Sequence, residues 1–152
     1  MSDSMNNEPR LLFPQLQPFY DKVEPLSWLL IRLAAGLIII PHGWPKLMQG
    51  IEATAKQALI SRSIEPAWPL AVSLITLETV GGLCVALGLF TRFWAAAIAI
   101  EMAVIVYHHL PNFGWTSRGY EYPLLWGLVM LAIALRGGCL LYTSPSPRDV
   151  EE

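Results

Sequence analysis

The chain has 152 residues, of which 54% are hydrophobic and only 14% are charged, against about a quarter charged in an ordinary soluble domain. The formal net charge of −2 argues against a nucleic-acid partner, which would need a basic surface, and two cysteines are too few for a disulfide scaffold. With a mean hydropathy of +0.45, the chain is expected to form a single membrane domain.

Residues 1–25 form a polar N-terminal segment. This segment holds several charged side chains and no long apolar run. A cleavable signal peptide is therefore not expected. The first hydrophobic stretch should act as its own insertion signal.

Four apolar stretches follow, each close to the ~20 residues that a helix needs to cross a bilayer. They predict helices over about residues 26–44, 68–90, 93–109 and 122–136. The second and third helices lack the polar face that a soluble bundle requires, and a two-residue connection makes them antiparallel neighbours. The expected fold is an all-α membrane protein with four transmembrane helices in an antiparallel bundle. Aromatic residues near the predicted ends resemble interfacial belts: Trp28, Trp44, Trp68, Trp94, Tyr107, Trp115 and Tyr122.

The first helix runs into the polar stretch "PHGWPKL", residues 41–47. Pro41 and Pro45 are expected to bend or end the helix there, while Lys46 reaches toward water. A short interfacial helix can follow, because four apolar residues of the next segment line one side of a helix: Ile51, Ala55, Ala58 and Leu59.

Three ionisable side chains lie inside the predicted spans, namely Arg32, Glu78 and Glu101. Each costs about 2.5–3.5 kcal/mol at the centre of a membrane helix, so each needs a partner or a role. The depths of Arg32 and Glu78 predict an intramembrane polar pair, which could either fix helix register or serve function. Glu101, if it faces Glu78, could share a proton with it.

Small residues indicate which helix faces pack against each other. Gly36 shares a face with Arg32, and Gly81 and Gly82 share a face with Glu78. These glycines are predicted to let two helix backbones approach closely.

An up-and-down trace of the helices predicts a polar cluster at one membrane face. Its members are His42, Lys46, His108, His109 and Glu121. Individually, the lysine could snorkel, the glutamate could cap its helix, and the histidines could be ordinary interfacial residues. The histidines and the glutamate are metal-ligand types, but no tight ligand spacing accompanies them, so no metal site is predicted.

Charge does not decide the orientation in the membrane. Four cations fall on the side of the termini and four on the opposite side, leaving out Arg32 in the first helix and Arg148 in the tail. The two sets are Arg10, Lys22, Arg92 and Arg136 against Lys46, Lys56, Arg62 and Arg118.

Several ordered motifs over about residues 26–138 resemble the DoxX family of small four-helix membrane proteins. Arg32 is followed by a glycine and then "HGWPK", and later come "LETVGGLCVALGLFTR", "HLPNFGW" and "GYEYPLL". Each motif alone is weak, whereas the ordered combination is specific. The family pattern falls on Arg32, His42, Gly43, Lys46, Glu78, Gly82, Arg92, His108 or His109, and Glu121.

The resemblance implies a multi-pass protein of the bacterial cytoplasmic membrane with cytoplasmic termini. It also implies a subunit or accessory of a quinone-linked redox or oxidative-stress system, in contact with lipid and with other membrane or peripheral redox subunits or further copies of itself. A bound quinone is the one cofactor it suggests, because no haem, flavin or iron–sulfur motif is present. Any catalysis would then belong to a quinone-dependent oxidoreductase and not to this chain alone, and no catalytic residue is assigned. A small-solute transporter and a purely structural or assembly subunit are the alternatives.

The tail over residues 139–152 departs from the family pattern. The sequence "CLLYTSPSPRD" that begins it resembles a translated sequencing adapter. We therefore expect it to replace the natural C-terminus. A genuine Ser/Pro-rich tail is the alternative.

Overall fold

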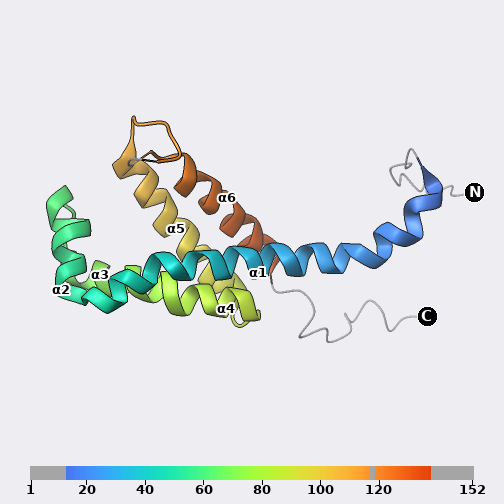
Figure 1. The fold of residues 1–152 in the computed structure, drawn as a ribbon, viewed down its shortest axis with the longest axis horizontal. Coiled ribbons are helices and arrows are strands. Elements are labelled where there is room, and N and C mark those ends of the chain that lie inside the picture. Colours follow the sequence, from blue (N-terminus) through green and yellow to red (C-terminus); the bar gives the residue numbers. More distant parts are fainter. Residues whose placement is uncertain (1–12, 117–118, 138–152) are drawn as a thin grey trace, which may run out of the picture.

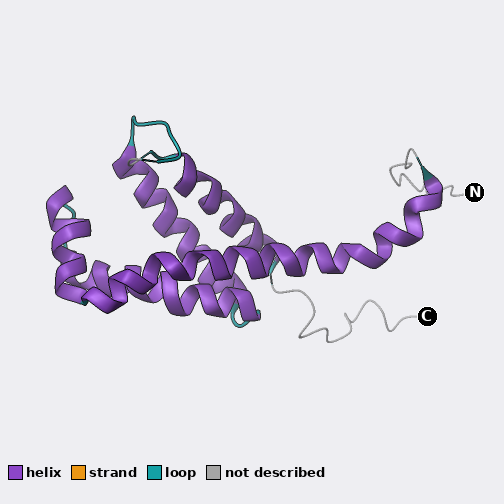
Figure 2. Cartoon of the chain, in the orientation of Figure 1, coloured by secondary structure: helices purple, strands orange, loops and turns teal. Residues whose placement is uncertain are grey.

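The computed structural model describes residues 13–116 and 119–137, and every regular element in those ranges is helical (Figures 1 and 2). The expected adapter-like tail lies outside the described residues, as does Arg118.

Within the described ranges, ten helical segments follow one another in chain order. They are η1 (Pro14–Leu16), α1 (Gln17–Gln49), α2 (Ile51–Thr54), η2 (Ala55–Leu59), η3 (Ile60–Arg62), α3 (Ala67–Thr76), η4 (Leu77–Gly81), α4 (Gly82–Leu87), α5 (Thr91–His109) and α6 (Glu121–Arg136). The segments α3, η4 and α4 form one continuous helix over Ala67–Leu87.

Helix α1 is longer than predicted and continues through Pro41 and Pro45, which were expected to bend or end it. Pro25, Pro41 and Pro45 all lie inside the helix, which ends only at Gly50 with φ 88°. A proline removes one backbone hydrogen bond, but the remaining bonds and the packing of the helix hold the next turns in place. Figure 1 shows α1 as a long, bent helix whose N-terminal part projects beyond the other helices.

The other predicted helices lie close to their expected bounds. The second ends at Gly88, whose φ of 83° suits glycine, and the third begins at Thr91 after Phe90. The connection between these helices is thus residues 88–90, not the predicted Thr91 and Arg92.

Two of the four expected spans are long and apolar enough to cross a membrane, α1 and the helix Ala67–Leu87. Helix α5 has 19 residues and α6 has 16. At about 1.5 Å per residue these are roughly 28 and 24 Å long, against a hydrocarbon core of about 30 Å. A bundle of four antiparallel spans therefore stays a prediction.

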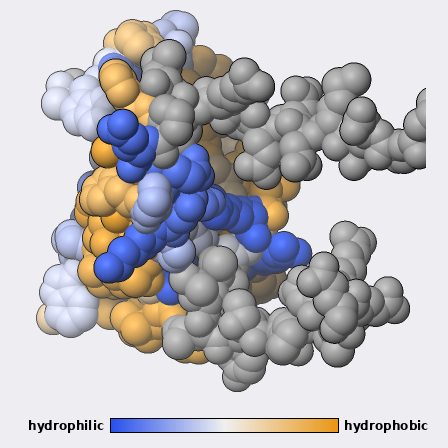
Figure 3. All heavy atoms as spheres, turned by 90° about the vertical axis from the view of Figure 1, so that its right-hand side faces the viewer, coloured by the Kyte–Doolittle hydropathy of each residue, from blue (hydrophilic) through white to orange (hydrophobic). Residues whose placement is uncertain are grey.

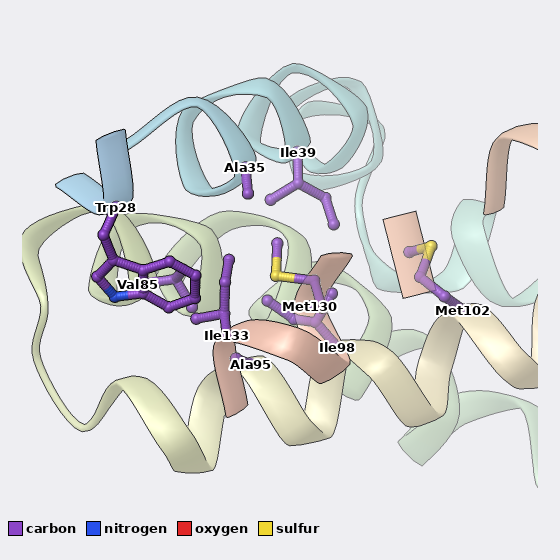
Figure 4. Close-up of a cluster of buried hydrophobic side chains, with 9 residues drawn as sticks. All are labelled: Trp28, Ala35, Ile39, Val85, Ala95, Ile98, Met102, Met130 and Ile133. Atoms are coloured by element: carbon purple, nitrogen blue, oxygen red, sulfur yellow. The ribbon is translucent and has the colours of Figure 1, made fainter. Parts of the chain in front are cut away.

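The helices pack as two pairs. Helix α1 lies along η4 and α4, and α5 lies along α6, with the second pair inclined to the first in Figure 1. Where the pairs meet, buried side chains from α1, α4, α5 and α6 converge (Figure 4). They are Trp28, Ala35, Ile39, Val85, Ala95, Ile98, Met102, Met130 and Ile133.

The helical segment from Ile51 to Arg62 corresponds to the predicted short helix. Ala55 and Leu59 are buried against Ala67 and Ala71 of α3, with Ile51 and Ala58 packed beside them. The four residues expected to share one side of this helix do contact one core. The segment is thereby held against the start of the second predicted span.

Much of the molecular surface is apolar, which suits contact with lipid. Exposed large hydrophobic residues occur along every long helix, including Leu30, Leu37, Leu83, Ile100 and Leu128. Figure 3 shows orange apolar side chains over much of one face, crossed by a run of hydrophilic residues. Soluble monomers rarely expose so much contiguous apolar area.

The end of α6 is joined to α1 through Trp28. The indole Nε1 donates a hydrogen bond to the Gly137 carbonyl at 3.3 Å, and the Arg136 guanidinium lies 4.5 Å from the ring centroid. Arg136 is half-exposed and its ion pair with Glu24 spans 3.7 Å between exposed side chains. The cation–π contact should therefore contribute more than the ion pair.

We expect Arg136→Gln to lower the free energy of unfolding by about 0.5–1 kcal/mol, because the substitution removes a partly exposed cation–π contact. The measurement is unfolding in mixed detergent–SDS micelles followed by tryptophan fluorescence. Glu24→Gln is the matched control and should cost less. An equal loss in both variants would assign the effect to the ion pair.

Candidate functional site

Glu78 lies at the point where the second predicted span widens into a π-helix. This widened turn is η4, and π-turns within α-helices are frequent at functional sites. Gly43 of α1 faces it so closely that a Cβ there would lie 2.7 Å from Glu78 Cβ. The absence of a side chain at Gly43 therefore allows α1 to pass directly over Glu78.

The cationic partner of Glu78 is Lys46. Its ammonium donates hydrogen bonds to both carboxylate oxygens, and the Glu78 side chain is only 4% exposed while that of Lys46 is 26% exposed. Lys46 lies three residues beyond Gly43, close to one helical turn, so the close helix approach positions this pair.

The sequence predicted that Arg32 pairs with Glu78. In the structure, Lys46 bonds the Glu78 carboxylate instead. Arg32 is buried, and its guanidinium lies beside Gly88, where an added Cβ would be 2.9 Å from Nη1. Gly88 ends α4, several residues after Glu78 in the chain. The depths of the charged residues in their predicted spans indicated that a cation of the first helix pairs with Glu78. Depth alone could not decide between Arg32 and Lys46.

The three glycines predicted to pack do lie at close contacts, but on two different seams. A Cβ on Gly36 would lie 2.5 Å from the Gly82 carbonyl oxygen, and one on Gly82 would lie 2.5 Å from Ile39. Gly81 instead faces α5, where a Cβ would be 3.0 Å from the Trp94 ring. Gly36 and Gly82 thus bring α1 and α4 together, while Gly81 accommodates α5.

His42 lies one turn before Lys46 and pairs with the start of α6. Its Nε2 lies 2.8 Å from the Tyr122 hydroxyl, and the two ring centroids are 5.4 Å apart. Tyr122 also contacts Trp115 and Trp126 edge to face, at centroid distances of 5.5 and 5.9 Å. Sequence reasoning placed Tyr122 and Trp115 only in an aromatic belt and did not single out Trp126.

These groups surround a cavity of about 490 Å³, which we call the polar cavity. Its functional lining is His42, Lys46, Glu78, His109, Trp115 and Tyr122. His109 contributes a buried Nδ1 that has no hydrogen-bond partner within residues 13–116 and 119–137. The residues that line the cavity therefore include two formed polar pairs and two buried ring nitrogens, His109 Nδ1 and Trp126 Nε1, that have no hydrogen-bond partner in the described residues.

The predicted interfacial cluster is only partly gathered at this cavity. His42, Lys46 and His109 line it, whereas His108 lines a neighbouring cavity and Glu121 begins α6 without lining either. No three His, Cys, Asp or Glu side chains in the described ranges are grouped as a metal site would require. The arrangement suits a polar organic ligand bound by hydrogen bonds.

Comparison with protein families gives one match. The family model described as DoxX matches residues 27–110, which is more than half of the chain. The matched region contains α1 from Ser27 onward, the paired Lys46 and Glu78, and both histidines at the end of α5. Comparison with curated proteins and with solved structures gives no match.

Proposed function

Because this chain belongs to the DoxX family of membrane proteins, we propose that it is a subunit or accessory of a quinone-linked redox or oxidative-stress system and binds a quinone in the polar cavity. The observation that carries the proposal is the buried Nδ1 of His109, which has no hydrogen-bond partner among the residues that the structure describes and belongs to a residue lining the same cavity as the Lys46–Glu78 and His42–Tyr122 pairs.

The size and lining of the polar cavity support an aromatic, partly polar ligand. Its volume of about 490 Å³ lies within the usual range of small-molecule sites. Trp115, Tyr122 and Trp126 offer ring faces and edges for stacking, and Ile39 and Met102 offer apolar contacts. A quinone ring combines a flat π-system with carbonyl oxygens and so matches both kinds of contact.

The polar groups support hydrogen bonding to quinone carbonyls. In its Nδ1-protonated tautomer, His109 can donate to a carbonyl oxygen, and the Tyr122 hydroxyl and Lys46 ammonium are further donors at the same cavity. Because Lys46 and Tyr122 already have partners, His109 Nδ1 and Trp126 Nε1, which are buried without a hydrogen-bond partner in the described residues, are the donors that a ligand would gain at least cost.

The proposal assigns binding to this chain and electron transfer to a partner. The quinone would connect the chain with other membrane or peripheral redox subunits, or with further copies of itself. We further propose that α1, the Ala67–Leu87 helix, α5 and α6 cross the bacterial cytoplasmic membrane as an antiparallel bundle with cytoplasmic termini.

The test is the affinity of a decyl-substituted benzoquinone for the purified protein in lipid nanodiscs, followed by quenching of tryptophan fluorescence. Trp115 and Trp126, two of the six tryptophans of the chain, line the polar cavity, so their share of the emission reports on it. We expect His109→Ala to weaken binding about tenfold, since one buried hydrogen bond contributes roughly 1–1.5 kcal/mol.

His108→Ala is the matched control, because His108 is the adjacent residue on α5 and does not line the polar cavity. Its affinity should equal that of the unsubstituted protein. Equal affinities of the two alanine variants would remove His109 from the site, and no quenching in any of the proteins would reject quinone binding.

A further inference from the structure

A second cavity of about 560 Å³ lies on the other side of α5, between α3, η4, α5 and residues 57–64. We call it the lateral cavity, and its walls include Leu70, Leu74, Ile100, Glu101, Val104 and His108. Leu70, Ile100 and Val104 are also exposed on the outer surface, at 38%, 67% and 49%. The lateral cavity therefore opens between α3 and α5 on an apolar surface, where a molecule dissolved in lipid could enter.

Glu101 is the buried polar group of the lateral cavity. It is 9% exposed, and neither carboxyl oxygen has a hydrogen-bond partner in the described part of the chain. Lys46 lines the same cavity, but its ammonium is bonded to both oxygens of Glu78. A buried carboxyl group without a partner costs several kcal/mol, which a ligand that donates a hydrogen bond would recover.

The charges around the lateral cavity select the kind of head group. Lys46 and Arg62 are the cations that line it, and the guanidinium of Arg62 already donates to the Ala58 carbonyl at 2.5 Å. The positive charges of Lys46 and Arg62 disfavour a cationic head group, and the mostly apolar lining disfavours a head group of either charge. A neutral hydroxyl can donate a hydrogen bond to Glu101 without bringing a further charge into the cavity.

We propose that the lateral cavity binds a neutral amphiphile with a hydroxyl head group, a phenol or an alcohol. Its hydroxyl donates a hydrogen bond to Glu101, and its apolar chain lies along Leu74 and Val104 toward the opening between α3 and α5. The site differs from the polar cavity, although Lys46, Ile105 and His109 border both. The inference does not depend on quinone binding.

The test compares 4-nonylphenol with its O-methyl ether by calorimetric titration of the protein in lipid nanodiscs. The ether carries a methyl group in place of the hydroxyl hydrogen that would reach Glu101, so it cannot donate that hydrogen bond. We expect the unsubstituted protein to bind the phenol at least tenfold more tightly than the ether. Glu101→Leu should abolish this preference, and Glu101→Gln, whose amide oxygen still accepts, should retain part of it.

Ser73→Ala is the matched control, since Ser73 lines the lateral cavity and carries its own hydroxyl. It should keep the full preference for the phenol. Quenching by the decyl-benzoquinone serves as an independent measure of the polar cavity and should be unchanged in both Glu101 variants. Failure of quinone binding would therefore not be confused with failure at Glu101.

Two results would overturn the proposal. One is equal affinity of the unsubstituted protein for the phenol and the ether. The other is an undiminished preference for the phenol in Glu101→Leu. If that variant does not fold, an undiminished preference in Glu101→Met, whose side chain is of similar length and carries no carboxyl oxygen, decides against the proposal in the same way.

Discussion

Lys46→Met should lower the free energy of unfolding by about 3 kcal/mol. Removing one partner of a buried ion pair leaves an uncompensated charge, which costs about 3–5 kcal/mol. Glu78 is 4% exposed and would lose the cation that bonds both of its oxygens. The lower end of the range applies because the Lys46 side chain is 26% exposed and water reaches part of it. Unfolding in mixed detergent–SDS micelles provides the measurement.

Lys56→Met is the control for loss of a lysine at an exposed position of the segment that follows α1. It should change the stability by less than about 0.5 kcal/mol. The double variant Lys46→Met with Glu78→Gln should recover most of the lost stability, because no buried charge remains. If Lys46→Met is as stable as Lys56→Met, the pair contributes nothing measurable.

Gly36→Val should cost about 3 kcal/mol by forcing α1 away from α4. A Cβ at this position would lie 2.5 Å from the Gly82 carbonyl oxygen and 2.6 Å from the Ala86 nitrogen. Both are backbone atoms of a packed helix, so a rotamer change cannot relieve the overlap. Overpacking usually costs about 1–3 kcal/mol, and the upper end applies where backbone must move. The same unfolding measurement applies.

Gly36→Ala is a second test of this contact, because the substitution has two opposing effects on the stability of the protein. Alanine should raise helix stability by about 1 kcal/mol relative to glycine. The close contact of the added methyl group with α4 should lower the free energy of unfolding by a larger amount. A net loss of stability would show that the seam dominates, and a net gain would show that the helices separate at little cost. Gly114→Ala is the control in the loop, where the nearest atom to an added Cβ is 3.8 Å away.

The positions of the helices could be largely predicted from the chain. Runs of apolar residues gave four helices near residues 26–44, 68–90, 93–109 and 122–136, and the structure has helices at all four places. The extension of α1 to Gln49 was missed, because two prolines in five residues usually end a helix. That expectation considers only the backbone hydrogen bond that each proline removes. It does not include the close packing of Gly43 against η4, which depends on residues far along the chain.

The candidate site was less predictable. Sequence reasoning identified Glu78, Lys46, His42 and His109, but assigned Glu78 to Arg32. Arg32 and Lys46 are fourteen residues apart on α1, and either could have faced a glutamate on a second helix whose register was unknown. The register of α1 against the second helix is set by the positions at which glycines allow close contact. Because Gly43 packs directly against Glu78, Lys46 reaches the Glu78 carboxylate.

The sequence by itself determined the membrane character, the helices and the family, because these depend on local composition, periodicity and ordered motifs. Only the tertiary structure decided the partner of Glu78, the division of the polar cluster between two cavities, and the burial of Glu101, whose carboxyl oxygens have no hydrogen-bond partner among the described residues. Those properties depend on distances between residues from different helices. Such distances are set by packing contacts at a few glycines. Each of these contacts joins two segments that are far apart in the chain.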